Sequence, residues 1–188
     1  PRSLFAADEA PKRGGRFRVP IGNGNTPGTL DPAAGGSYFK TNLTYAVRNH
    51  LAEVDSDDKL VPELAESWEP SPHATRWMFK IRKGVEFHNG KTLDANDVVA
   101  SINYHRGENS KSGGKSLVEN VKEVRVDGND TVIFDLKAGY ADFPAVLSSY
   151  HFAILPSDGE GNVTWKDGVG TGAYVLDDFN PGVRATLK

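Results

Sequence analysis

Cysteine is absent from all 188 residues of the chain. This absence excludes a disulfide framework, cysteine-ligated zinc, a thiol nucleophile and a lipid-anchored cysteine within these residues. Long apolar runs are missing as well, since no stretch approaches the ~20 residues that a helix needs to cross a bilayer. The chain therefore has to be held together by an ordinary hydrophobic core, for which its length is sufficient.

Neither sign of charge dominates the sequence. The 22 Lys and Arg residues are scattered among 25 Asp and Glu residues, for a formal net charge of −3. A nucleic-acid-binding surface requires clustered basic residues, so no nucleic-acid partner is expected. The hydrophobic share of 38% and charged share of 25% are typical of a globular domain. Residues 1–13, with the short apolar stretch Ser3–Ala7, are expected to be a flexible N-terminus or the remnant of a signal peptide.

Motifs of catalysis and cofactor binding are also lacking. The sequence contains no Gly-x-Ser-x-Gly elbow, no phosphate-binding loop and no His-Glu-x-x-His helix. Two Gly-x-Gly pairs, at Gly22–Gly24 and Gly170–Gly172, lack the third glycine of a dinucleotide fingerprint and indicate turns. The histidines lie far apart, with no i, i+4 pair: His50, His73, His88, His105 and His151. We therefore expect a binding module without catalytic residues, metal or cofactor.

Alternation of apolar and polar residues predicts several short strands. Pro20 lacks an N–H for a ladder, so the first strand is expected at a sheet edge. Leu60–Trp68 is expected to be a short packed segment. The predicted strands cover 16–21, 76–82, 85–88, 121–126, 131–136 and 152–155, and a final hairpin joins 174–176 to 184–188 across 180–182.

Helical spacing of apolar residues predicts three helices, over 39–51, 94–105 and 142–149. Asp94 is expected as the N-cap of the second helix, with Asp97 three residues later in a capping-box position. Strands and helices are mixed along the chain, so the predicted fold class is α/β or mixed α+β.

Several separate motifs, in a fixed order, point to one known family. They are Thr29-Leu30-Asp31-Pro32, Pro62–Glu69, Trp77–Gly90, Leu93–Val99 and Gly170-Thr171-Gly172-Ala173-Tyr174. Together they resemble the signature of family 5 solute-binding proteins, which includes dipeptide-, oligopeptide- and nickel-binding proteins. Ala173 departs from the pattern, since the family usually has proline there. Within the central motifs, Trp68, Trp77, Phe79 and Phe87 are expected to be packing residues and not ligand contacts.

The resemblance implies a periplasmic-binding-protein-like fold of class II, of which this chain supplies the first lobe only. Residues 14–50 are expected to begin that lobe, 51–165 to form a small inserted α+β subdomain, and 166–188 to return into the lobe. The second lobe would lie after Lys188, and the chain would be part of a longer two-lobed protein.

The resemblance also implies a function. Such a protein captures peptides or a similar small solute in its cleft and delivers it, in the periplasm, to the permease subunits of an ABC importer; a monomer is expected. Gly36, Ser37, Tyr38 and Phe39 are the predicted ligand contacts, because they combine flexible backbone, a hydroxyl and aromatic rings at the start of a helix.

Tyr150 and Thr171 join the predicted contacts, and His151 is a further candidate, because the resemblance places their neighbourhoods near the cleft. Other readings stay open. The same fold serves as a carrier of nickel, metal chelates, sugars or opines, and a hydrolase or a sensor ectodomain are the alternatives outside transport.

Overall fold

The computed structural model describes residues 14–22 and 28–188. Its largest element is a four-stranded antiparallel sheet in the order β3-β4-β6-β5. The strands are β3 (Ala65–Pro70), β4 (Arg76–Ile81), β5 (Val121–Asp127) and β6 (Thr131–Leu136). The expected N-terminal segment 1–13 and part of the turn at Gly22–Gly24 lie outside the described residues.

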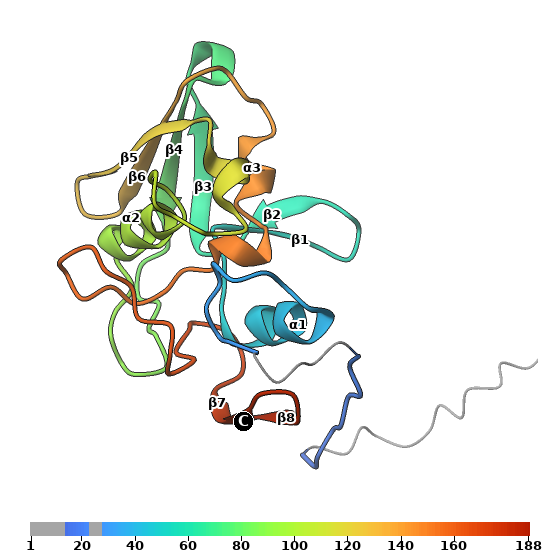
Figure 1. The fold of residues 1–188 in the computed structure, drawn as a ribbon. Coiled ribbons are helices and arrows are strands. Elements are labelled where there is room, and N and C mark those ends of the chain that lie inside the picture. The colour runs from blue at the N-terminus through green and yellow to red at the C-terminus, as the bar shows by residue number, and fades with distance from the viewer. Residues whose placement is uncertain (1–13, 23–27) are drawn as a thin grey trace, which may run out of the picture.

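Two small hairpins and three helices complete the architecture. The hairpins are β1 (Ala52–Val54) with β2 (Leu60–Pro62), and β7 (Leu176–Asn180) with β8 (Arg184–Leu187). The helices are α1 (Tyr38–Val47), α2 (Ala95–Tyr104) and α3 (Phe143–Val146), and three 3-10 turns are η1 (Pro72–Ala74), η2 (Lys115–Val118) and η3 (Tyr150–Phe152). Figure 1 shows the large sheet and α2 at one end of the molecule and α1 with the β7–β8 hairpin at the other.

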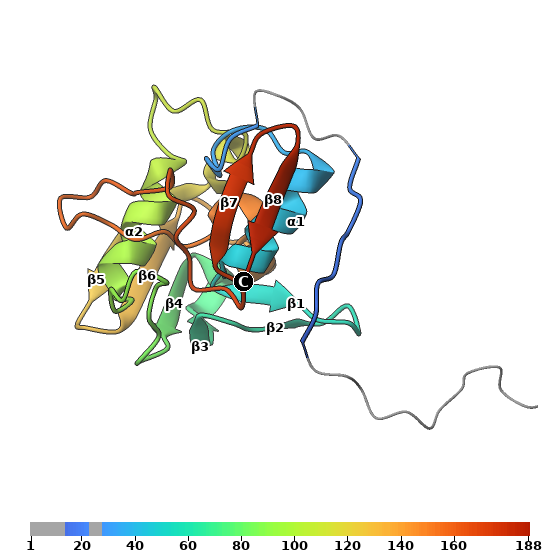
Figure 2. The same cartoon turned by 90° about the horizontal axis from the view of Figure 1, so that it is seen from below.

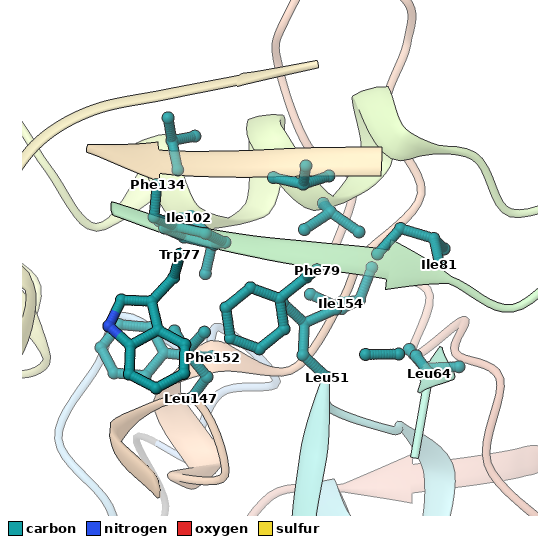
Figure 3. Close-up of a cluster of buried hydrophobic side chains, with 14 of the residues drawn as sticks. Leu51, Leu64, Trp77, Phe79, Ile81, Ile102, Phe134, Leu147, Phe152 and Ile154 are labelled. Atoms are coloured by element: carbon teal, nitrogen blue, oxygen red, sulfur yellow. The ribbon is translucent and has the colours of Figure 1, made fainter. Parts of the chain in front are cut away.

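The core lies against one face of the large sheet. Along β4 the residues alternate as predicted, with Trp77, Phe79 and Ile81 buried and their neighbours facing solvent. The ring of Phe79 meets that of Phe134 edge to face, with centroids 5.3 Å apart. Figure 3 shows this face covered by side chains from distant parts of the chain, among them Leu51, Leu147, Phe152 and Ile154. The predicted packing role of the aromatic residues of the central motifs is confirmed.

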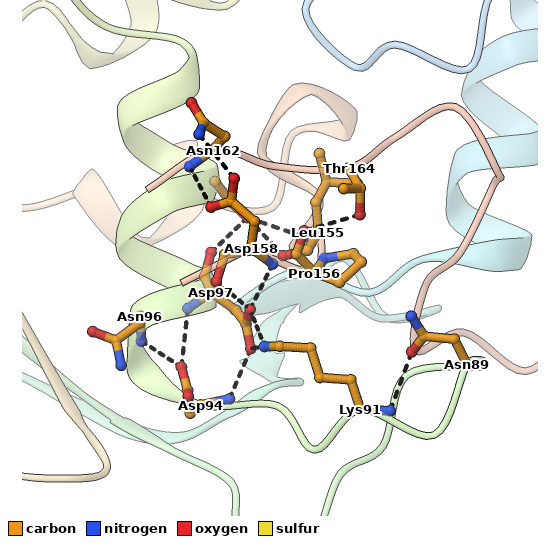
Figure 4. Close-up of polar contacts among 12 residues, drawn as sticks. Asn89, Lys91, Asp94, Asn96, Asp97, Leu155, Pro156, Asp158, Asn162 and Thr164 are labelled. Carbon is orange, nitrogen blue, oxygen red and sulfur yellow. Dashed lines mark hydrogen bonds and ion pairs between the residues drawn. The ribbon is translucent and has the colours of Figure 1, made fainter. Parts of the chain in front are cut away.

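The start of α2 confirms the predicted capping box. The Asp94 carboxylate accepts from Asn96 N at 2.7 Å and Asp97 N at 3.2 Å, and the Asp97 carboxylate accepts from Asp94 N at 3.0 Å. Asp97 is fully buried and also accepts from Ser157 N at 2.7 Å and Ser157 Oγ at 2.8 Å, and it pairs with Lys91 (Figure 4). This carboxylate therefore joins the helix start to the chain that follows Leu155.

The first helix ends earlier than predicted. Ser37 Oγ accepts from Lys40 N at 3.2 Å as the N-cap, but the backbone turns extended at Arg48 (φ −129°, ψ 152°), so the expected end at residue 51 is wrong. Leu51 is fully buried, and its carbonyl accepts from Ala65 N at 3.0 Å beside the large sheet. Its apolar side chain belongs to the sheet core and not to the helix stripe.

Two predicted strands do not form. Residues 16–21 pair with no described strand, and Phe17 is 90% exposed. Residues 152–155 are buried as expected, but Ile154 N donates to Asn49 O and Leu155 N to Ser101 Oγ, so loop and side-chain acceptors replace a ladder.

Smaller differences concern boundaries. The strand expected over 85–88 is reduced to one bridge between Glu86 and Thr92, and the helix expected over 142–149 keeps only α3. The packed segment 60–68 contains β2 and most of β3. The hairpins β5–β6 and β7–β8 form as predicted, the latter with Asn180 opposite Arg184.

Phe79→Ala is expected to lower the free energy of unfolding by about 3–5 kcal/mol, because it leaves a cavity at a fully buried position of the core. Met78→Ala, one residue away on the exposed face, is the matched control and is expected to change it by less than about 1 kcal/mol. Urea unfolding followed by circular dichroism measures both. Equal losses for the two variants would contradict this assignment of the core face.

Candidate functional site

A groove lies at the N-terminal end of α1. We call residues 28–37 the wall loop; this loop, the first turns of α1 and the tip of the β7–β8 hairpin enclose a pocket of about 150 Å³. Figure 2 shows the hairpin lying beside α1. Phe39 and Phe179 both line the groove, and their rings stack with centroids 6.4 Å apart and planes 16° apart. The lining includes three of the predicted contacts, Gly36, Ser37 and Phe39.

Two further predicted residues lie at the same end of α1. The ring of Tyr150 packs directly on Gly36, so closely that a Cβ there would lie 2.6 Å from Tyr150 Oη. Tyr38 is the first residue of α1 and is 71% exposed. The structure therefore brings five of the six predicted ligand contacts to one place, from segments more than a hundred positions apart in the sequence.

Thr171 lies elsewhere. Its Oγ1 donates to Asn49 Oδ1 at 2.9 Å, beyond the C-terminal end of α1. Gly172 packs on the backbone there, since a Cβ on Gly172 would lie 2.4 Å from Val47 C. Because α1 has ten residues, about 15 Å separate its two ends. The structure therefore does not bring Thr171 to the groove. Gly170 and Gly172, on either side of it, allow this segment to pack closely on the backbone at Val47.

Two buried cations hold the walls of the groove. Lys40 is 7% exposed, and its Nζ donates to Asp31 O and, at 2.6 Å, to Ala34 O. Arg48 is 3% exposed and donates to Leu30 O at 2.8 Å and Trp165 O at 3.0 Å. Both side chains therefore tie α1 to backbone carbonyls of the neighbouring loops.

Burial shifts the titration of both cations. Desolvation lowers the pKa of Lys40 to about 8 and that of Arg48 to about 10, and the charge of Asp31 opposes the shift in each case. Among the described residues neither cation forms an ion pair, so their carbonyl partners are the main compensation for lost hydration. Sequence reasoning missed them. The available signal was the spacing of Lys40, which shares a helix face with buried Leu43, Thr44 and Val47. Arg48 lies directly after the helix, where the backbone is extended, and helical spacing gives no signal for it.

The wall loop is also fastened from the other side. Tyr104 Oη donates to Asp31 Oδ1 at 3.1 Å, and Gly113 N donates to Ala33 O at 2.9 Å. His151 Nδ1 donates to Pro32 O at 2.9 Å, so this candidate supports the loop from behind. The groove therefore has a wall whose backbone is pinned at several successive residues.

The groove offers contacts for binding. A hydroxyl, backbone amides and aromatic faces line it, and these groups suit hydrogen bonds and stacking with a small solute. Within 14–22 and 28–188, no three His, Asp or Glu side chains are grouped to hold a metal ion. In the same residues, no helix has the length and apolar character required to span a membrane.

Comparison with known proteins identifies the family. A family model described as bacterial extracellular solute-binding proteins, family 5 Middle, matches residues 59–188. The chain belongs to this family. It is 28% identical over 181 residues to the dipeptide-binding protein of Escherichia coli, covering 80% of this chain and 34% of that protein. The family and the fold class predicted from the sequence motifs are thus confirmed.

Solved structures of the family agree. The oligopeptide-binding protein AppA of Bacillus subtilis, in complex with a nonapeptide, is 26% identical with a TM-score of 0.72, covering 88% of this chain and 35% of that one. NikA of Brucella suis, in complex with Fe(III)-EDTA, is 27% identical with a TM-score of 0.73, covering 90% and 34%. The chain therefore spans about a third of the length of these family 5 proteins.

Gly172→Ala is expected to lower the free energy of unfolding by about 3 kcal/mol, because the added methyl group would overlap backbone that cannot move aside. Gly35→Ala is the matched control: a Cβ there meets nothing within 4 Å, so its effect should stay within about 0.5 kcal/mol. Chemical denaturation of both variants provides the measurement. A neutral Gly172→Ala would mean that this close approach to α1 is absent in solution.

Proposed function

We propose that the protein containing this chain is the solute-binding component of an ABC importer, which captures peptides or similar small solutes in a two-lobed cleft and passes them to the membrane permease. The observation that carries the proposal is the family 5 match over residues 59–188. The likeness to AppA with its bound nonapeptide favours peptides as the solute. The proposed place of action is the bacterial periplasm, and the proposed working form is a monomer that binds its solute without transforming it.

The proposed lobe boundaries follow from the arrangement of the chain. Residues 14–50 and 166–188 would belong to one lobe, and 51–165 to a subdomain inserted in it. Two contacts support the pairing of the outer segments: Tyr174 N donates to Ala46 O at 3.2 Å, and Phe39 stacks on Phe179. The large sheet lies apart from this region in Figure 1.

In this proposal the groove is one wall of the cleft. Exposed Tyr38 would offer its ring face and hydroxyl to the solute, and the first N–H groups of α1 would donate to a solute carbonyl or carboxylate. Gly36 and Ser37 would contribute backbone contacts, with Phe39 and Tyr150 as the apolar support behind them. A solute that also reached Thr171 would span about 15 Å, the length of an extended peptide of roughly four or five residues.

The groove alone would supply only part of the affinity. A micromolar carrier needs about 8 kcal/mol of binding free energy, more than one hydroxyl, one exposed aromatic ring and a few amides provide. The remaining contacts are therefore assigned to a second lobe, and closure of the lobes would be driven by the higher affinity of the closed form for the solute.

A metal chelate is the second candidate solute, because NikA with its bound Fe(III)-EDTA is as similar to this chain as AppA is. Isothermal titration calorimetry of the full-length protein with peptides of two to nine residues, and separately with metal chelates, distinguishes the two. Recovery of intact peptide after incubation separates a carrier from a hydrolase.

Tyr38→Ala in the full-length protein is expected to raise the Kd for peptide by about tenfold, because an exposed aromatic ring is lost from the cleft wall. Tyr38→Phe measures how much the Tyr38 hydroxyl alone contributes to the affinity for peptide. Met78→Ala, on the outer face of the large sheet, is the control and should leave Kd unchanged. Wild-type affinity in the Tyr38→Ala variant would refute the placement of the cleft at the N-terminal end of α1.

A further inference from the structure

Two buried histidines lie side by side behind the wall loop. His105, the residue that follows α2, is fully buried, and His151 of η3 is nearly so. Their ring centroids are 6.3 Å apart, with planes at 67°. Among the described residues neither ring forms an ion pair with a carboxylate. The pair therefore occupies a place where an imidazolium charge would have no counterion in contact.

Each histidine holds a different segment. His151 donates from Nδ1 to Pro32 O in the wall loop, at 2.9 Å. His105 Nδ1 lies 2.6 Å from Ser112 Oγ, and that hydroxyl also accepts from Gly114 N at 3.1 Å. His105 thus shapes the turn at 112–114, and His151 holds the loop against which that turn packs.

The turn and the wall loop meet directly. Gly113 N donates to Ala33 O at 2.9 Å. A Cβ on Gly114 would lie 2.9 Å from His151 Cβ, so the turn packs tightly on the histidine. The hydrogen bond from Gly113 to Ala33 therefore lies beside the His151 ring, since a Cβ on Gly113 would be 3.1 Å from His151 Cε1, although Gly113 itself is exposed.

The surroundings of His105 disfavour a positive charge on its ring. Burial, the neighbouring His151 and the Lys40 ammonium lower the pKa of His105 to about 4. His105 Nε2 has no hydrogen-bond partner among the described residues. A backbone hydrogen bond at His151 favours the protonated ring but offsets only part of the lowering of the pKa. The other titratable and charged groups that face the pair come from α1, α2, η3 and the wall loop: Lys40, Tyr104, Tyr150 and Asp31.

The sign of the pH effect follows from this arrangement. In an open state, where water reaches the ring, His105 would titrate near its ordinary pKa of about 6.5. Between that value and about 4 the open state binds a proton that the closed state excludes, so each step of acidification favours opening. Above about pH 6.5 both states are neutral and the preference for the closed state is complete.

We propose that the His105–His151 pair is an acid-sensitive latch for the cleft wall, with His105 as its titrating member: while His105 is neutral, the pair holds the wall loop against the turn at 112–114, and protonation of His105 releases the loop and with it the solute. His105 and His151 act as positioning residues through Pro32 and Ala33 and do not touch the solute. The release of solute rests on the proposed function, whereas the opening of the loop does not.

The test replaces both histidines by asparagine, whose amide nitrogen reproduces Nδ1 but does not titrate in this range. Two quantities are measured on the full-length protein at pH 7.5 and pH 4.5: the protection of the Gly113 amide against hydrogen exchange, corrected for intrinsic rates, and the Kd for peptide. In the wild type, acidification is expected to reduce the protection and to raise Kd by about tenfold or more. In the double variant both should change by less than about threefold.

His73→Asn is the matched control, because this histidine is exposed and its φ of 70° suits asparagine; it should follow the wild type. A double variant that keeps the wild-type pH dependence of Gly113 protection overturns the latch. If the double variant is unfolded at pH 7.5 by circular dichroism, the single variant His105→Asn replaces it, with a reduced pH dependence as the expected result and an unchanged one as the refutation. Absence of peptide binding at pH 7.5 in the wild type would refute the proposed function alone, because Gly113 protection still tests the latch.

Discussion

The burial of Lys40 in α1 and of Arg48 directly after it is the constraint on which the candidate site depends. A cation removed from water is strongly unfavourable unless hydrogen bonds replace its hydration. Here the replacements are mostly backbone carbonyls of two loops, including those of Asp31 and Trp165. If a loop that supplies these acceptors moved away, the buried cation would lose the hydrogen bonds that replace its hydration. The wall loop is thus held in place by the hydrogen bonds that its carbonyls accept from Lys40 and Arg48.

This arrangement gives α1 two different sides. On its buried side lie the two cations, and Gly172 packs against its C-terminal end. At its N-terminal end, Tyr38 is exposed beside the groove. A wall that is already ordered loses little conformational freedom when a solute binds, so more of the contact energy remains as affinity. Because the wall is held by a few contacts, it is also sensitive to changes that weaken them. In the latch proposed above, His105 is the contact that responds to protons.

The large sheet contributes in a different way. Its inner face forms the core, and residues after that core, Ile154 and Ser157, connect it to α1 and α2 through Asn49 and Asp97. These bonds join residues that lie far apart in the sequence, Ile154 with Asn49 and Ser157 with Asp97. The groove and the sheet are consequently parts of one packed unit, even though the ligand contacts come from short loops.

Some of this was determined by the sequence alone. The alternation in β4, the capping box at Asp94 and the two hairpins follow from neighbours in the chain, because periodicity and turn chemistry are local. The family motifs are local in the same sense, and they led directly to the fold. Five of the six predicted contacts also meet, since four of them are consecutive.

Tertiary structure decided the rest. The alternation over 16–21 does not show whether a partner strand lies nearby. The helical spacing of Leu51 does not show that this residue packs in the core of the large sheet. The sequence marks Lys40 as a surface residue and the two latch histidines as unrelated, because burial and the meeting of residues 105 and 151 depend on contacts between distant segments. Which polar groups lose their water is a property of the packed chain, and no local pattern encodes it.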